Sequence, residues 1–205
     1  MPYPQAQRIM CRYGDRMAAG GARPLLWLLE HPHLYTCGPR SRSADILEPT
    51  RLPIFATNRG GEVTYHGPGQ RIVYACLDVR QLTGGDMRAF VRRMETCVID
   101  ALDRLGVRGW SDPTRPGGWV KKSDAPEERA KIAAIGLQVR RGISRHGIAL
   151  NVDPDLSHFE AIVPCGLADS AVTSLADLGI ATDTQTVDRL LCQAFSEWLG
   201  PLDMR

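Results

Sequence analysis

Short apolar runs that favour β-strands alternate along this chain with longer segments whose apolar residues recur at helical spacing. Helices are predicted over residues 5–19, 86–105 and 184–199, with Asp86 as the N-cap of the second helix and Gly106 at its end. Strands are predicted over residues 24–29, 70–79, 131–139 and 146–152. This alternation predicts an α/β (α+β) fold in which helices flank a mixed β-sheet.

The length and charge of the chain narrow the possible classes of protein. Its 205 residues suit a single domain spanning residues 1–205, and a net charge of only +2 argues against nucleic acid as a partner. No apolar run approaches the roughly 20 residues that cross a bilayer, and residues 1–10 lack the apolar core of a signal peptide. The six cysteines form no C-x-x-C pair, which favours free thiols in a reducing cytoplasm.

The densest local pattern is the segment 59–70, RGGEVTYHGPGQ, which has four glycines and one proline. Such a segment is held in tight turns, some with positive φ, and its backbone N–H groups can approach a ligand closely. It also carries the polar side chains of Arg59, Thr64, Tyr65, His66 and Gln70. A hairpin connection is the simpler interpretation of a generic glycine-rich loop, and the segment lacks the spacing of the known phosphate-binding loops.

Two later strands carry further candidates. Lys131 opens the apolar run KIAAIG, where partial burial favours a neutral amine that can accept a proton. A surface lysine whose stem packs along the strand fits the same pattern. In the segment 145–151, RHGIALN, the small residues Gly147 and Ala149 leave room for an acyl chain or for a packed helix. His146 is equally compatible with a buried core histidine.

Cys165 lies between Pro164 and Gly166, on a constrained turn from which its sulfur can project. A nearby cation or helix N-terminus favours the nucleophilic thiolate, and Lys131 is a candidate for that cation. The alternative is a cysteine that packs as a small buried hydrophobe.

Taken together, these motifs resemble the lipoyl(octanoyl) transferases over most of the chain, from about residue 3 to about residue 178. The most specific matches are RGGEVTYHGPGQ at 59–70, GGWV at 117–120, KIAAIG at 131–136, SRHGIALNV at 144–152 and PCG at 164–166.

The resemblance implies a fold like the catalytic domains of biotin and lipoate protein ligases. It also implies that Cys165 is the nucleophile and that Lys131 is its acid–base partner. The residues expected to contact the substrate are Arg59, Gly60, Gly61, Glu62, Val63, Thr64, Tyr65, His66, Ala134, Ile135, Gly136, Gly147, Ile148 and Ala149.

The implied reaction moves an octanoyl group from octanoyl-acyl carrier protein to a lysine of lipoyl domains, in 2-oxoacid dehydrogenases and in the glycine cleavage H protein. This is the first step of endogenous protein lipoylation. A thioester on Cys165 lets one protein partner leave before the other docks. Backbone N–H groups of the glycine-rich segment, together with His66, are candidates for stabilising the oxyanion. The enzyme is expected to be a cytoplasmic monomer that needs no cofactor and no metal, and neither nucleic acid nor membrane is expected as a partner.

Three alternatives remain open from the sequence. An ATP-dependent lipoate or biotin protein ligase would share the fold but would have no use for Cys165. A non-catalytic protein that binds lipoyl domains would tolerate the loss of that thiol. A zinc protein built on His66 and His146 lacks a recognisable ligand spacing.

Overall fold

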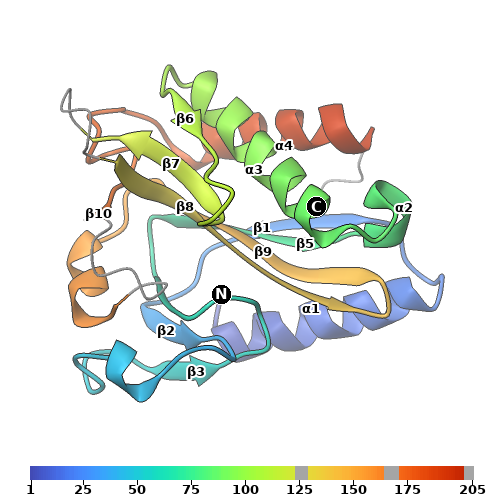
Figure 1. Ribbon diagram of the computed structural model, residues 1–205, viewed down its shortest axis with the longest axis horizontal. Helices are drawn as coiled ribbons and strands as arrows, with labels where there is room; N and C mark the ends of the chain where they lie inside the picture. The colour runs from blue at the N-terminus through green and yellow to red at the C-terminus, as the bar shows by residue number, and fades with distance from the viewer. Residues whose placement is uncertain (123–128, 164–170, 201–205) are drawn as a thin grey trace.

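The protein is described here by a computed structural model that covers residues 1–122, 129–163 and 171–200 (Figure 1). Within these residues a seven-stranded sheet has the strand order β1-β5-β9-β8-β7-β6, with β10 beside β8. Its strands are β1 Leu25–Leu29, β5 Gln70–Cys76, β6 Gly109–Trp110, β7 Gly117–Lys121, β8 Arg129–Arg140, β9 Ile143–Asn151 and β10 Ala171–Val172. Every pairing is antiparallel except that of β10 with β8, so the sheet is mixed, as predicted.

A smaller sheet has the order β3-β2-β4, in which β2 is parallel to β3 and antiparallel to β4. Helices α3 and α4 cover one face of the large sheet, whereas α1 and the small sheet lie on the other side (Figure 1). The remaining elements are β2 Leu34–Cys37, β3 Ile54–Ala56, β4 Val63–His66, α1 Tyr3–Ala18, α2 Val79–Thr83, α3 Met87–Asp103, α4 Thr184–Leu199 and the 3₁₀ turns η1 Ser43–Asp45 and η2 Leu156–Ala161. None of the helices in these ranges is long and apolar enough to span a bilayer.

Side-chain caps set the helix boundaries. Asp86 accepts hydrogen bonds from the backbone N–H groups of Arg88 and Ala89, so α3 begins where the sequence predicts. Helix α4 coincides with its predicted range. The predicted strand 70–79 is too long, because Asp78 caps α2 in the same way and ends the extended backbone after Cys76.

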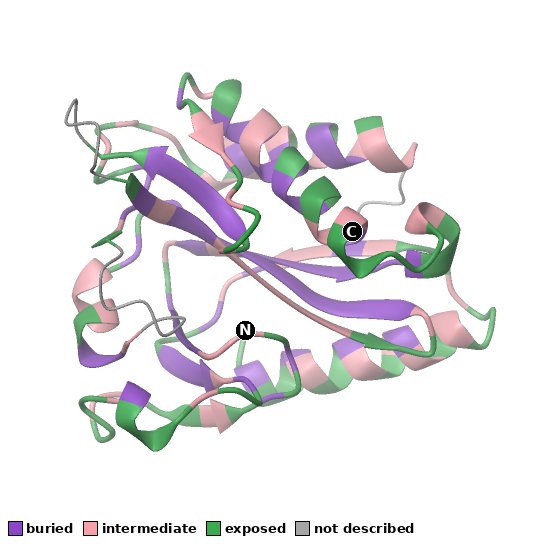
Figure 2. Cartoon of the chain, in the orientation of Figure 1, coloured by how far each residue is buried: buried purple, intermediate pink, exposed green. Residues whose placement is uncertain are grey.

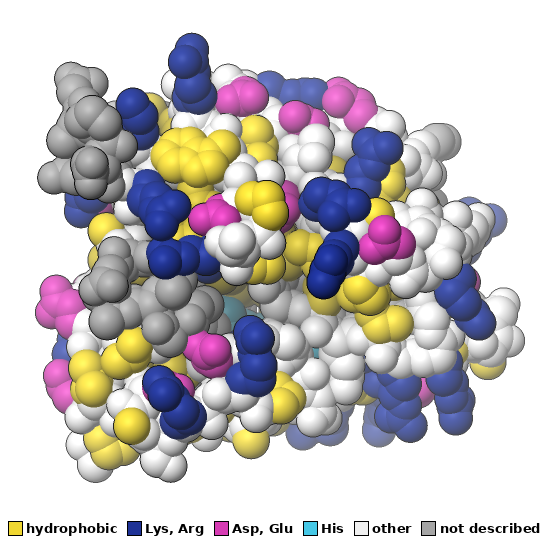
Figure 3. Space-filling model, viewed as in Figure 1, with side chains coloured by type: hydrophobic (Ala, Val, Ile, Leu, Met, Phe, Trp, Pro, Cys, Tyr) yellow, Lys and Arg dark blue, Asp and Glu magenta, His cyan; other side chains and the backbone are white. Residues whose placement is uncertain are grey.

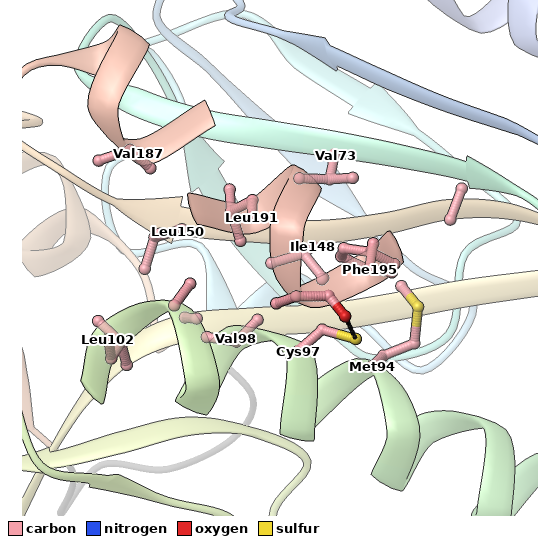
Figure 4. Packing of buried hydrophobic residues seen from close by; sticks show 14 of the residues in the cluster. Val73, Met94, Cys97, Val98, Leu102, Ile148, Leu150, Val187, Leu191 and Phe195 are labelled. Carbon is pink, nitrogen blue, oxygen red and sulfur yellow. Dashed lines mark hydrogen bonds between the residues drawn. The ribbon is translucent and has the colours of Figure 1, made fainter. Parts of the chain in front are cut away.

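The strands are buried on both faces, which explains their nearly continuous apolar runs. On β5, Val73 packs beneath α3 and α4 (Figure 4), whereas its neighbours Ile72 and Tyr74 pack toward α1. All residues of β9 are buried, and Figure 2 shows this strand enclosed between the two layers.

An ion pair between a buried arginine and a half-exposed aspartate holds α1 against the sheet. Arg145 of β9 is only 2% exposed and donates to the Asp15 carboxylate of α1 at 2.7 Å. A Cβ atom on Gly14 would lie 2.8 Å from Arg145 Nε, so the helix approaches the guanidinium closely. The hydrogen bond from Arg145 holds the pKa of the Asp15 carboxyl below its usual range. This contact fixes the helix whose first residue, Tyr3, reaches the pocket described below.

The core beneath α3 can be tested with two substitutions on that helix. Phe90 is fully buried, so Phe90→Ala is expected to lower the free energy of unfolding by about 3–5 kcal/mol. Met87 is 37% exposed, so Met87→Ala is expected to change it by less than about 1 kcal/mol. Urea unfolding of both variants measures the difference, and equal losses would contradict this packing.

Candidate active site

A pocket opens between the small sheet and the α1 side of the large sheet. Histidine side chains show at the bottom of a hollow on this face of the molecule (Figure 3). The pocket is lined by Tyr3, Thr36, Arg59, Gly60, Gly61, Thr64, His66, Ile72, Tyr74, Ala134, Ile135, Gly136, His146, Gly147, Ile148 and Ala149.

Most residues predicted to contact the substrate lie on this pocket wall, although they come from three separate motifs. Glu62, Val63 and Tyr65 are not among the lining residues. Side chains alternate along β4, so Val63 and Tyr65 point into a separate cluster with Tyr35. Their predicted role as substrate contacts finds no support in the pocket geometry.

Residues from other elements complete the wall. Sequence reasoning missed Tyr3 at the start of α1, Thr36 of β2, and Ile72 and Tyr74 of β5. His146 is buried, as the sequence allowed, and it also lines the pocket. Its backbone has a positive φ of 59°, which is unusual for a residue other than glycine.

The floor of the pocket is built from small cross-strand pairs of β8 and β9. Ala134 pairs with Ala149, and Gly136 pairs with Gly147. A Cβ atom on Gly147 would lie 2.2 Å from the Val73 carbonyl oxygen, so only glycine fits there. Backbone and methyl groups therefore form this part of the wall and leave space above it.

Lys131 points to the pocket side of the sheet because of an irregularity in the β7–β8 pairing. Consecutive residues of β7 pair with Ala133 and then with Lys131, which leaves Ile132 without a partner on β7. Ile132 and Ala133 both pack in the core beneath α3, so the usual alternation is interrupted. Lys131 therefore shares the face of Ala134, and its half-buried side chain donates from Nζ to the Pro116 carbonyl at 3.1 Å.

A chain of buried hydrogen bonds runs along the opposite wall. The Arg59 guanidinium donates to the carbonyl and the hydroxyl of Thr36, at 2.6 and 2.9 Å. His66 lies between the Thr36 hydroxyl (3.1 Å from Nε2) and the Gln70 amide oxygen (2.6 Å from Nδ1). The Gln70 amide nitrogen donates to Asn151 Oδ1, so its oxygen faces His66 and accepts the Nδ1 hydrogen. The Thr36 hydroxyl then donates to Nε2, and the ring is neutral.

The same chain reaches the strand that carries Lys131. The Asn151 amide donates to the Thr173 carbonyl at 2.9 Å, and the Thr173 N–H donates to the Lys131 carbonyl at 3.1 Å. The pocket wall and the Lys131 backbone are thus connected through paired polar groups.

Burial controls the charge of the pocket histidines. Burial, reinforced by the positive charge of Arg59, lowers the pKa of His66 to about 3. The same two causes lower the pKa of His146 to about 3. Because both ring nitrogens of His66 are engaged within the protein, neither has an N–H group left to donate to an oxyanion.

The candidate nucleophile Cys165, with Pro164 and Gly166, lies outside the described residues, as do residues 123–128. The five described cysteines are free thiols. Burial raises the pKa of Cys76 and Cys97 to about 12, which disfavours a thiolate at either position. In the described ranges, no three histidine, cysteine or acidic side chains are grouped so that they could hold a metal ion.

The neutrality of His66 predicts an acid-sensitive native state. Below about pH 6.5 the unfolded chain binds a proton at this histidine, but the native protein excludes it until about pH 3. Stability therefore falls as the pH falls through this window, by about 1.4 kcal/mol per pH unit for this one group. The free energy of unfolding, measured with urea between pH 4.5 and pH 6, should depend on pH less steeply in His66→Gln than in the wild type, by about that amount. Equal slopes would mean that the native protein protonates His66.

The chain matches the family model described as the lipoyl protein ligase A/B catalytic domain over residues 2–196. It is 50% identical to an octanoyltransferase from Nitrobacter hamburgensis, over 100% of this chain and 86% of that protein. An octanoyltransferase from Agrobacterium fabrum is 49% identical, over 97% of this chain and 76% of the relative.

Solved structures show the same fold at low sequence identity. The bipartite lipoate protein ligase from Thermoplasma acidophilum superposes with a TM-score of 0.72 at 18% identity, covering 97% of this chain and 82% of that one. A lipoate-protein ligase A bound with ATP gives a TM-score of 0.68 at 18% identity, with 94% and 82% covered. The predicted fold class is confirmed by these two structures.

Proposed function

The chain belongs to the lipoyl protein ligase A/B catalytic domain family, and on that premise we propose that it transfers octanoyl groups in protein lipoylation. Relatives about half identical over the whole chain are octanoyltransferases, so the chain is an enzyme of the transferase class. The proposed donor is octanoyl-acyl carrier protein. The proposed acceptors are lysines of lipoyl domains, in 2-oxoacid dehydrogenases and in the glycine cleavage H protein. We place the reaction in the cytoplasm, on a single domain that acts as a monomer.

The observation that carries the proposal is a pocket whose floor of small residues leads to Lys131. On this floor Ile72 lies beside Ala149, and Ala149 lies beside Ala134. Ala134 in turn pairs with Gly117, where a Cβ atom would lie 3.5 Å from Lys131 Nζ. Three strand spacings separate the ends of this row, about 14 Å. A linear acyl chain laid along the row brings its activated carbonyl carbon to Lys131.

The proposed mechanism has two half-reactions. In the first, Lys131 takes the proton of Cys165, and the thiolate attacks the carrier's thioester carbonyl. The carrier thiolate leaves and takes up that proton, so the octanoyl group is now a thioester on Cys165. In the second, the neutral amine of the acceptor lysine attacks this thioester, and Lys131 accepts the proton that the amine loses. The proton returns to Cys165 as its thiolate leaves, and the amide product dissociates.

One feature of the protein and one property of the proposed donor agree with this division of roles. The thiols buried in the described core have raised pKa values, so they are poor nucleophiles compared with a thiol beside a lysine. The donor thioester is already activated, so the proposed transfer consumes no ATP. An ATP-dependent ligase would instead form an adenylate before the transfer.

Intact-protein mass spectrometry after mixing with octanoyl-acyl carrier protein tests the covalent step. The wild type and a Cys192→Ser control should each gain one hydroxylamine-sensitive octanoyl group. Cys165→Ser should gain none, and Lys131→Ala should gain it about 10²- to 10⁴-fold more slowly because it lacks the acid–base group.

Other outcomes of this experiment would contradict the proposal. An adduct that survives in Cys165→Ser would place the nucleophile elsewhere. Activity only with free lipoate and ATP, with release of pyrophosphate, would favour the ligase. A chain that binds lipoyl domains equally well after Cys165→Ala, and that never acquires an acyl group, would be a binding protein.

The pocket floor makes a separate prediction about chain length. Ala149→Leu adds a branched side chain to the floor, so it should reduce octanoyl transfer relative to butanoyl transfer by about 10-fold or more. Ala181→Leu, at an exposed position, should leave the ratio unchanged. Rates of adduct formation with donors of different acyl length measure this ratio. An unchanged ratio in Ala149→Leu would mean that the acyl chain lies elsewhere.

A further inference from the structure

Helix α3 carries a buried carboxylate on a face that is otherwise apolar. Glu95 is only 3% exposed. The other buried residues of this helix are Phe90, Met94, Cys97, Val98, Ala101 and Leu102. A buried carboxylate destabilises a fold unless it is hydrogen-bonded or paired with a positive charge, so its contacts require an explanation.

The carboxylate of Glu95 holds the turn that leads into β7. Its Oε1 accepts a hydrogen bond from the Gly117 N–H at 3.0 Å. Gly117 has a φ of 141°, and a Cβ atom there would lie 2.4 Å from the Ala133 carbonyl oxygen and 3.2 Å from Lys131 Cε. Only glycine fits at this position, and the turn therefore lies directly against the Lys131 side chain.

The same turn also binds the amine of Lys131. The carbonyl of Pro116, the residue before Gly117, accepts a hydrogen bond from Lys131 Nζ at 3.1 Å. The Trp119 ring lies 4.9 Å from Nζ and provides a cation–π contact. Trp119 is itself fixed by a hydrogen bond from its indole N–H to the Arg115 carbonyl at 2.9 Å. One side of the turn thus meets Glu95 and the other side meets Lys131.

The charges around this turn interact with one another. Burial raises the pKa of the Glu95 carboxyl, while the Gly117 N–H, Arg92 and Lys131 oppose that rise and Asp112 adds to it. Arg129 lies over the same Trp119 ring as Lys131 and pairs with Asp112. A glutamine would accept the Gly117 hydrogen bond equally well, so the negative charge is the property that distinguishes glutamate at this position.

We propose that Glu95 is a positioning residue for Lys131. It holds the 116–117 turn whose carbonyl accepts the hydrogen bond of the Lys131 amine. Its negative charge stabilises the ammonium group that forms transiently when this amine takes up a proton within each half-reaction. The inference rests on the proposed function for its role in catalysis, but the coupling between Glu95 and Lys131 can be measured without any acyl transfer.

The lysine content of the chain makes that measurement direct. Lysine occurs only at positions 121, 122 and 131. Trace labelling with acetic anhydride, followed by peptide mass spectrometry, therefore reports the neutral amine of Lys131 beside the internal reference of exposed Lys121. In Glu95→Gln, Lys131 should be labelled at least about threefold faster than in the wild type at the same pH, because a nearby negative charge is lost. Lys121 should not change.

Two further variants separate charge from hydrogen bonding. Asp100→Asn removes a carboxylate elsewhere on α3 and should leave the labelling of Lys131 unchanged. Glu95→Ala removes both the charge and the acceptor of the Gly117 N–H. In a transfer assay it should lower kcat more than Glu95→Gln does, with little change in KM for the donor. Glu95→Asp keeps the charge and should restore the labelling rate of the wild type.

Equal labelling of Lys131 in the wild type and in folded Glu95→Gln would overturn the proposal and leave Glu95 as a structural acceptor. If Glu95→Gln does not fold, the coupling can be measured in the wild type by a pH titration. The ¹³C signal of reductively dimethylated Lys131 should show an inflection in the acid range as Glu95 takes up its proton, and a flat titration would contradict the coupling. Faster labelling in a protein that transfers no octanoyl group would support the coupling and reject the proposed function.

Discussion

The antiparallel pairing of β8 with β9 is the constraint on which the rest of the structure depends. On the face toward α3 and α4, Ile135 pairs with Ile148 and contributes to the main core. On the opposite face, Ala134 pairs with Ala149, and the small side chains leave the pocket open. A shift of one residue would exchange these two faces, so the register that buries the core also builds the pocket.

The polar groups at the two ends of the pocket differ in their charge and in their hydrogen bonds. Along the wall, burial and the positive charge of Arg59 keep His66 neutral, and Thr36 and Gln70 satisfy its two ring nitrogens, so His66 adds no charge near neutral pH. At the other end, Lys131 is held over Trp119 by a carbonyl of the turn that Glu95 fixes. The first arrangement suits an apolar chain, and the second suits proton transfer.

Local chemistry decides how much of the fold could be predicted from the sequence. Helix α3 was predictable because its N-cap Asp86 and its apolar spacing are both local features. The small sheet was not predicted, since its strands have three or four residues each and carry little periodicity. The strand from Gln70 was predicted to be too long, because the sequence alone does not distinguish Asp78, which caps α2, from a polar residue within a strand.

The residues of the site could be predicted only where they lie within a recognisable sequence motif. Three of the five segments of the resemblance, 59–70, 131–136 and 144–152, contribute residues to the pocket, but Tyr3 and Thr36 reach it only through tertiary packing. The face to which Lys131 points depends on a break in the strand pairing. Strict alternation of side chains along β8 would place Lys131 on the same face as Ala133, toward the core. Glu95 was missed because a single acidic residue in an amphipathic helix is usually exposed.

The most direct test of the account is a crystal structure of the protein after reaction with octanoyl-acyl carrier protein. The account predicts a thioester on Cys165, an acyl chain that lies over the small residues of β8 and β9, and a carbonyl group beside Lys131. An acyl chain in the separate groove between α1 and β1, which is lined by Tyr13 and Trp27, would contradict it. So would a chain that extends into solvent from a different residue.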